Sequence, residues 1–154
     1  METRSEWYNH IAEGINYHKD TLDKKDYKKY KLDLLLRLAK RVDSFSSLCG
    51  ECQPFQQEIT RLIEDLRNLY LMSKENRKSY FKTISQITKH LQKGHKLVTE
   101  GYYLGIGMAI GAGIGVAIGA ALGNPGIGPA IGVALGIAIG SYLDRKAKKE
   151  GRII

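Results

Sequence analysis

No charged residue occurs between Glu100 and Asp144, and this is the longest uncharged stretch in a chain of 154 residues. Elsewhere charge is plentiful, with 24 Lys or Arg against 16 Asp or Glu and a net charge of +8. An apolar run of about 18 residues or more without charge is typical of a membrane-spanning helix. The uncharged stretch therefore argues against an entirely soluble protein and indicates a membrane segment.

The sequence also lacks the patterns of a catalyst. It has no glycine-rich phosphate loop after a strand, no Ser/His/Asp arrangement, and a single tryptophan, Trp7. Its first ten residues are polar, so no cleavable signal peptide is expected. We therefore predict a protein that is not an enzyme and that has no small-molecule substrate.

A lysine-rich stretch at residues 19–31 holds six lysines interleaved with three aspartates and two tyrosines. Nucleic-acid-binding segments usually carry a recognisable motif and more arginine, so no nucleic acid is expected as a partner. We interpret the stretch as a solvated turn between two helices. Contact with anionic lipid headgroups is the alternative interpretation.

The uncharged segment is built from a tetrapeptide repeated eight times, four copies on each side of a break at residues 122–126. On a helix, four residues turn about 400°, so each column of the repeat forms a slowly winding stripe. In water each glycine would cost a helix about 1 kcal/mol relative to alanine. In lipid, a stripe of glycines lets two helices approach closely. The predicted helix-packing stripe comprises Gly107, Gly111, Gly115, Gly119, Gly123, Gly128, Gly132, Gly136 and Gly140.

The two halves of this segment have the lengths of membrane spans. Residues 102–123 number 22 and residues 125–143 number 19, against about 20 for a membrane-spanning helix. Asn124, Pro125 and Gly126 are typical of a chain reversal. A transmembrane β-barrel is not expected, because its strands need only about ten residues and polar positions facing the lumen. We therefore predict a transmembrane helical hairpin over residues 101–143.

A second stripe of small residues, which includes Ala109, Gly113 and Ala117, is left free to pack against another molecule. The expected partners are therefore membrane lipid together with a second copy of the chain or another membrane protein. Lysine and arginine lie on both flanks of the hairpin, and its turn has none. Because basic residues mark the cytoplasmic side, we predict an integral protein of the cytoplasmic membrane with both termini cytoplasmic, the basic tail being residues 144–154.

Residues 1–100 are predicted to form a separate cytoplasmic helical domain. They hold 19 basic and 14 acidic residues and a single proline, Pro54. Apolar residues recur at helical spacing, and short connections make neighbouring helices antiparallel. The expected fold is all-α, an up-down four-helix bundle followed by the hairpin. The helices are expected at about residues 7–22, 27–48, 54–70 and 73–98, with a turn near Met72 and with Leu48, Leu69, Tyr70 and Val98 on their apolar faces.

Two cysteines and two histidines in this domain form the residue set of a zinc site. Cys49 and Cys52 fall in the turn between the second and third helices, and His90 and His95 fall at the end of the fourth. These two places lie at the same end of an up-down bundle. Thiolates and imidazoles together suit tetrahedral zinc. His10, at the start of the first helix, is the alternative ligand.

The spacing of these residues leaves other interpretations open. Thirty-seven residues separate Cys52 from His90, and the histidines are five residues apart, unlike compact zinc fingers. Two reduced thiols are one alternative, with His95 an ordinary core residue. The Cys-Gly-Glu-Cys sequence resembles the redox tetrad of thioredoxin-like proteins, although a helix and not a strand precedes it. Iron–sulfur or haem iron is a further alternative, and a structural disulfide is disfavoured in the cytoplasm.

Residues 101–149 resemble the small prokaryotic glycine-zipper hairpin proteins, in which Ile-Gly or Leu-Gly tetrads flank a turn containing asparagine and a basic tail follows. The resemblance implies the hairpin architecture and no particular activity. Two classes of function follow from the sequence. The first is a non-catalytic membrane scaffold, sensor or complex subunit, and the second is a pore-forming effector or small channel gated by the bundle. The absence of ionisable residues within the spans favours the first.

Overall fold

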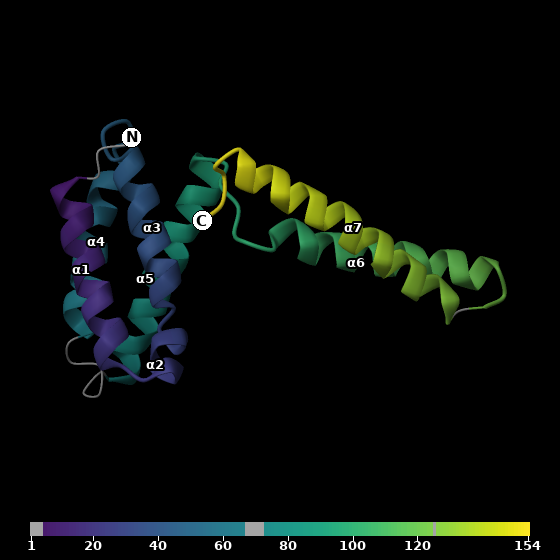
Figure 1. Ribbon diagram of the computed structural model, residues 1–154, viewed down its shortest axis with the longest axis horizontal. Coiled ribbons are helices and arrows are strands. Elements are labelled where there is room, and N and C mark those ends of the chain that lie inside the picture. The colour runs from purple at the N-terminus through teal and green to yellow at the C-terminus, as the bar shows by residue number, and fades with distance from the viewer. Residues whose placement is uncertain (1–4, 67–72, 125) are drawn as a thin grey trace. The chain divides into compact units, whose positions relative to one another are not determined.

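The computed structural model describes residues 5–66, 73–124 and 126–154, and every regular element among them is a helix (Figure 1). This confirms the predicted all-α fold. The chain divides into two compact units, residues 1–95 with Ile154 and residues 96–153. The first unit contains five of the described helices and the second contains the other two.

The first unit is a helical bundle. Its central helix is α3 (Leu32–Phe45), which packs against α1 (Glu6–Thr21), α4 (Cys52–Leu66) and α5 (Lys74–Gly94). Helix α1 spans Glu6–Thr21 and begins at Ser5, whose side chain accepts a hydrogen bond from the backbone N–H of Tyr8. Such a cap satisfies one of the free N–H groups at a helix start. Its inner face has helical spacing and buries Tyr8, Ile11, Ile15 and His18.

The second predicted helix is divided in two. Helix α2 spans Lys24–Lys29 and α3 spans Leu32–Phe45. Between them Lys31 adopts a left-handed conformation with φ 54°, which interrupts the helical hydrogen-bond ladder. The expectation of one helix from residue 27 to residue 48 was therefore wrong. Leu48 lies beyond the end of α3 and is 88% exposed, not in the core.

Tyr80, on α5, stabilises this break. Its hydroxyl donates a buried hydrogen bond of 2.9 Å to the carbonyl of Tyr30. Burial raises the pKa of Tyr80, so the phenol keeps its proton and remains a donor. The ring of Tyr30 also stacks on Phe81, with the centroids 6.0 Å apart. Tyr80 and Phe81 of α5 thus fix the position of Tyr30, which lies in the break between α2 and α3.

Replacement of Tyr80 by phenylalanine is expected to destabilise the protein by about 1–3 kcal/mol, because it leaves the buried carbonyl of Tyr30 without this donor. Chemical denaturation followed by circular dichroism would measure the change. Tyr17→Phe is the matched control, because Tyr17 is 64% exposed. Equal stabilities of the two variants would contradict the assigned role of the Tyr80 hydroxyl.

The third and fourth predicted helices correspond to α4, Cys52–Leu66, and α5, Lys74–Gly94. Ser73 begins α5 by accepting a hydrogen bond from the backbone N–H of Asn76. The expected apolar positions Leu69 and Tyr70 and the turn at Met72 lie outside the described residues. Val98 is not part of the fourth helix, because α5 ends at Gly94; its N–H donates to the carbonyl of Arg152 at 2.8 Å.

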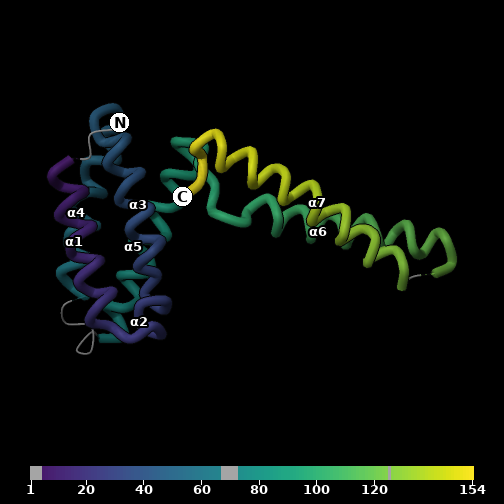
Figure 2. Tube along the Cα trace, viewed as in Figure 1, coloured from purple at the N-terminus to yellow at the C-terminus, as the bar shows by residue number. Residues whose placement is uncertain are grey.

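The second unit is a hairpin of α6, Tyr102–Ala121, and α7, Ile127–Lys149, which run side by side (Figure 2). Both helices are long and apolar enough to cross a membrane. The turn follows a common helix-ending pattern: the N–H of Asn124 donates to the carbonyl of Gly119, and the N–H of Gly123 donates to that of Ala120. Gly123 has φ +70°, which suits glycine.

Glycines line the contact between α6 and α7. A Cβ atom added to any of these glycines would overlap backbone atoms of the facing helix or of the turn. Bare backbones therefore meet directly, as close helix crossings require. Gly123 is an exception among the predicted stripe, because a Cβ there would meet nothing within 4 Å. The glycines in the contact are Gly107, Gly111, Gly115, Gly119, Gly128, Gly132, Gly136 and Gly140.

Asp144 closes the open end of the hairpin. The residue before α6 is Gly101, which has no side chain to cap the helix. The carboxylate of Asp144 on α7 instead accepts from the N–H groups of Tyr103 and Leu104, at 3.1 and 3.0 Å. A negative charge at a helix start is also favourable to the helix dipole. The first charged residue after the apolar repeats thus serves as the cap of the preceding helix.

Candidate metal centre

The two cysteines are brought together by the turn that joins α3 to α4. The N–H of Cys49 donates to the carbonyl of Phe45 at 2.9 Å, which continues the end of α3 by one further turn. The N–H of Cys52 then donates to the carbonyl of Cys49 at 3.0 Å, and Cys52 begins α4. Cys52 is fully buried and Cys49 is half-buried. Both thiols are free, without a disulfide.

The two histidines come from the end of α5. His90 lies in the last two turns of the helix, and His95 is the residue that ends it, with its N–H bonded to the carbonyl of Leu91. On a continuous helix, residues five apart point about 140° away from each other. Because α5 stops at Gly94, the backbone of His95 leaves the helical path. The end of the helix therefore allows both rings to reach the same place.

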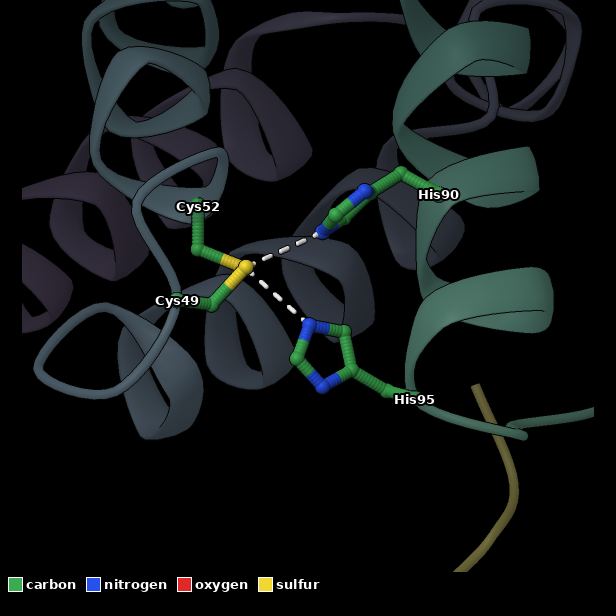
Figure 3. Close-up of side chains that lie close together, drawn as sticks. All are labelled: Cys49, Cys52, His90 and His95. Carbon is green, nitrogen blue, oxygen red and sulfur yellow. Dashed lines mark hydrogen bonds between the residues drawn. The ribbon is translucent and has the colours of Figure 1, made fainter.

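The rings of His90 and His95 point toward the cysteine sulfurs (Figure 3). The Nε2 atom of His90 lies 3.4 Å from the Sγ of Cys49 and 3.5 Å from the Sγ of Cys52. The Nε2 atom of His95 lies 3.4 Å from the Sγ of Cys52. The four donor atoms all lie within 4.8 Å of one another. They are therefore close enough to bind a single metal ion.

His10, the alternative ligand predicted from the sequence, does not belong to this group. It lies on α1 with an exposed side chain, and the group found among the described residues contains only the other four. The start of α1 is instead tied to the end of α3, because the hydroxyl of Ser5 donates to the carboxylate of Asp43 at 2.5 Å. The start of α1 therefore lies near the end of α3 as expected, but the His10 side chain is exposed and does not reach the cluster.

The surroundings of Cys52 and His95 favour the neutral form of each side chain. Burial raises the pKa of the Cys52 thiol to about 12, and Cys49 and Glu51 beside it act in the same direction. Burial, together with the nearby ring of His90, lowers the pKa of His95. A neutral imidazole has a lone pair for a metal, whereas a thiol must lose its proton to become a ligand. Without a cation the neutral forms of Cys52 and His95 are therefore favoured.

Two aromatic rings and one carboxylate hold the histidines in place. The ring of His95 stacks on Phe45 with centroids 3.9 Å apart, and that of His90 packs at 5.3 Å from Phe55. The Nδ1 atom of His90 lies 2.7 Å from an oxygen of Glu51. The contacts of Glu51 and Phe45 with the histidines were not predicted from the sequence. The signal for Glu51 was its position between the two cysteines, because the turn that presents both thiols also presents this carboxylate.

Comparison with known proteins identifies no relative of this chain. No family model matches the chain, and no curated protein and no solved structure matches it either.

Proposed function

We propose that this protein is a non-catalytic membrane-anchored scaffold, sensor or complex subunit, whose bundle is held together by a structural zinc ion. The observation that carries the proposal is the convergence of Cys49, Cys52, His90 and His95 within 4.8 Å. Four protein ligands complete the coordination of zinc and leave no open position for a reactive water, which is typical of a structural and not a catalytic site.

The distances are compatible with a tetrahedral zinc ion. Zinc–sulfur and zinc–nitrogen bonds of about 2.3 and 2.0–2.1 Å at a tetrahedral angle separate sulfur from nitrogen by about 3.6 Å. Three of the four sulfur–nitrogen pairs in the cluster lie 3.4, 3.5 and 3.4 Å apart. Because the widest separation in the group is up to 4.8 Å, binding would draw the side chains slightly inward. Purified full-length protein in detergent should therefore contain close to one zinc per chain by elemental analysis.

The place of the site in the chain gives it a mechanical role. His95 directly follows the last residue of α5, and the chain then leads to Tyr102, the first residue of α6. Zinc would tie this end of α5 to the turn between α3 and α4. The bundle would then be stiffest where the chain continues into the hairpin. A change of metal occupancy would be transmitted from there, as a sensor requires.

A membrane location accounts for the surface of the hairpin. Only 11% of the most apolar 18-residue stretch of α6 is buried, and only 17% of that of α7. Large apolar side chains such as Ile110, Ile114 and Ile131 are more than half exposed. Soluble proteins rarely expose apolar surface continuously over two long helices. The basic residues at the end of α7 would lie at the cytoplasmic surface, together with the bundle.

This location predicts the result of fractionation and protease treatment. The protein should stay with the membrane in alkaline carbonate, because the hairpin is held by burial of apolar surface and not by surface charge. Protease should remove the bundle and the tail from inside-out vesicles, while intact cells should protect both. Release into the carbonate supernatant would contradict the membrane assignment. Cleavage of the bundle in intact cells would contradict the orientation.

The second stripe of small residues supports self-association of the hairpin. Ala109, Gly113 and Ala117 are exposed on α6, away from the glycines that contact α7. A further helix could approach this face as closely as α7 approaches the other. The alternative function, a pore or small channel, is less well supported. Among the described residues 102–124 and 126–142, the only ionisable side chains are the tyrosines at the ends of the two spans. Conducting segments usually carry more such groups.

A further inference from the structure

The two nitrogens of the His90 ring face different chemical groups. Nδ1 lies 2.7 Å from the Oε2 atom of Glu51. Nε2 lies 3.4 and 3.5 Å from the sulfurs of Cys49 and Cys52. The His90 side chain is only 13% exposed, and Phe55 packs beside its ring. The ring is therefore held with one nitrogen toward a carboxylate and the other toward the thiols.

This division determines where the proton of a neutral imidazole belongs. A neutral ring has one N–H and one nitrogen with a free lone pair. If Nδ1 has the proton, it donates to Glu51 and leaves the lone pair of Nε2 facing the sulfurs. In the other tautomer, Nδ1 and the carboxylate would be two acceptors facing each other, and a proton on Nε2 would block metal binding. The position of Glu51 thus favours the tautomer that can bind a metal.

We propose that Glu51 is a positioning residue of the metal centre, which holds His90 in the Nδ1–H tautomer and so strengthens metal binding through Nε2. The inference rests on the proposed zinc site. A carboxylate that accepts a hydrogen bond from a metal-bound histidine also makes the ring a stronger electron-pair donor to the metal. Loss of such a partner typically weakens metal binding about 10- to 100-fold. Glu51 lies between the two cysteine ligands, so one short turn supplies two thiolates and this carboxylate.

The exposure of Glu51 sets the expected size of its effect. Its side chain is 77% exposed, so water competes for the carboxylate and screens its charge. The loss of affinity should therefore lie near the lower end of the usual range, about tenfold. His95 is held in a different way, by stacking on Phe45 at 3.9 Å. Removal of Glu51 should therefore weaken the bond from His90 and leave the other three ligands able to bind.

The test compares the zinc affinity of the full-length protein in detergent with that of its Glu51 variants, by competition with a chelator of known affinity. We expect binding about tenfold weaker in Glu51→Ala. A smaller loss is expected in Glu51→Gln, because the amide oxygen still accepts a hydrogen bond. Glu58→Gln is the matched control, since Glu58 is an α4 carboxylate paired with Arg61 and not with a histidine. All variants should still bind one zinc at saturation.

The tautomer itself is measured without metal. Nitrogen-15 NMR of the imidazole side chains in the metal-free protein should show His90 as the Nδ1–H tautomer, and a mixture of tautomers in Glu51→Ala. Cobalt in place of zinc should give the same tetrahedral absorption bands in both proteins, at a higher cobalt concentration in the variant. This pattern distinguishes positioning from a general loss of structure, which would change the bands.

The outcomes separate the two proposals. If the wild-type protein binds no zinc, the proposed zinc site is wrong and the inference about Glu51 is wrong with it. If the wild type binds zinc and Glu51→Ala binds equally well, only the role of Glu51 is overturned. An Nε2–H tautomer of His90 in the metal-free wild type would also overturn it, whatever the zinc affinity.

Discussion

Replacement of Cys52 by serine is expected to abolish stoichiometric zinc binding and to lower the melting temperature of the bundle by roughly 10–20 °C. A ligand present at 100 times its dissociation constant stabilises the folded state by about 2.7 kcal/mol, and 1 kcal/mol corresponds to roughly 4–8 °C in a domain of this size. Cys52 is the fully buried member of the cluster and lies near both histidines. Thermal melting by circular dichroism, together with elemental analysis of the same sample, would measure both effects.

A chelator distinguishes loss of zinc from loss of packing at Cys52. The wild-type melting temperature should fall on addition of chelator, whereas that of Cys52→Ser should not change further. His10→Ala is the matched control, because His10 is exposed and outside the cluster; it should retain one zinc and the wild-type response. A metal-free wild type that melts unchanged would reduce the cluster to ordinary thiols and imidazoles, as would a Cys52→Ser protein that still binds one zinc.

Replacement of Gly115 by leucine is expected to force α6 and α7 apart. A Cβ at this position already overlaps the carbonyl of Gly128 on the facing helix, and backbone atoms cannot move aside as the end of a side chain can. Overpacking of this kind typically costs about 1–3 kcal/mol, and a leucine against backbone should cost at least the upper value. The helices would also lose dispersion contacts along the stripe. Thermal unfolding of the hairpin and protease resistance in detergent would report the change.

Gly113→Leu is the control for this experiment. Gly113 lies two residues away on the same helix, and a Cβ there would meet nothing within 4 Å. The Gly113→Leu substitution changes side-chain size and helix propensity as much as Gly115→Leu does. Because the added side chain meets no other atom, the hairpin should stay closed. If copies associate through the second stripe of small residues, this variant should instead lower the oligomer mass. Equal stability of the Gly113 and Gly115 variants would show that the glycine stripe does not hold the hairpin together.

Local features of the sequence were enough to predict the architecture. The absence of charge over residues 101–143 and the tetrapeptide repeat predicted two apolar helices and a turn, because helix formation and membrane length depend on neighbouring residues. A helix starting at about residue 73 was predicted for the same reason, and Ser73 caps that helix in the structure. The start of α3 could not be predicted in this way. The left-handed conformation of Lys31 accompanies a hydrogen bond from Tyr80, which is fifty residues from Tyr30 in the sequence.

The residue types alone identify which side chains could bind a metal, because thiols and imidazoles are among the groups that bind zinc. Which of these side chains lie close together depends on how the helices pack. Histidines five residues apart can converge only because α5 ends at Gly94, and His10 is excluded because its side chain faces solvent. The same holds for Glu51 and Asp144, whose carboxylates act on His90 and on the start of α6. Hydrogen bonds form between atoms about 3 Å apart in space, and distance along the chain does not reveal that proximity.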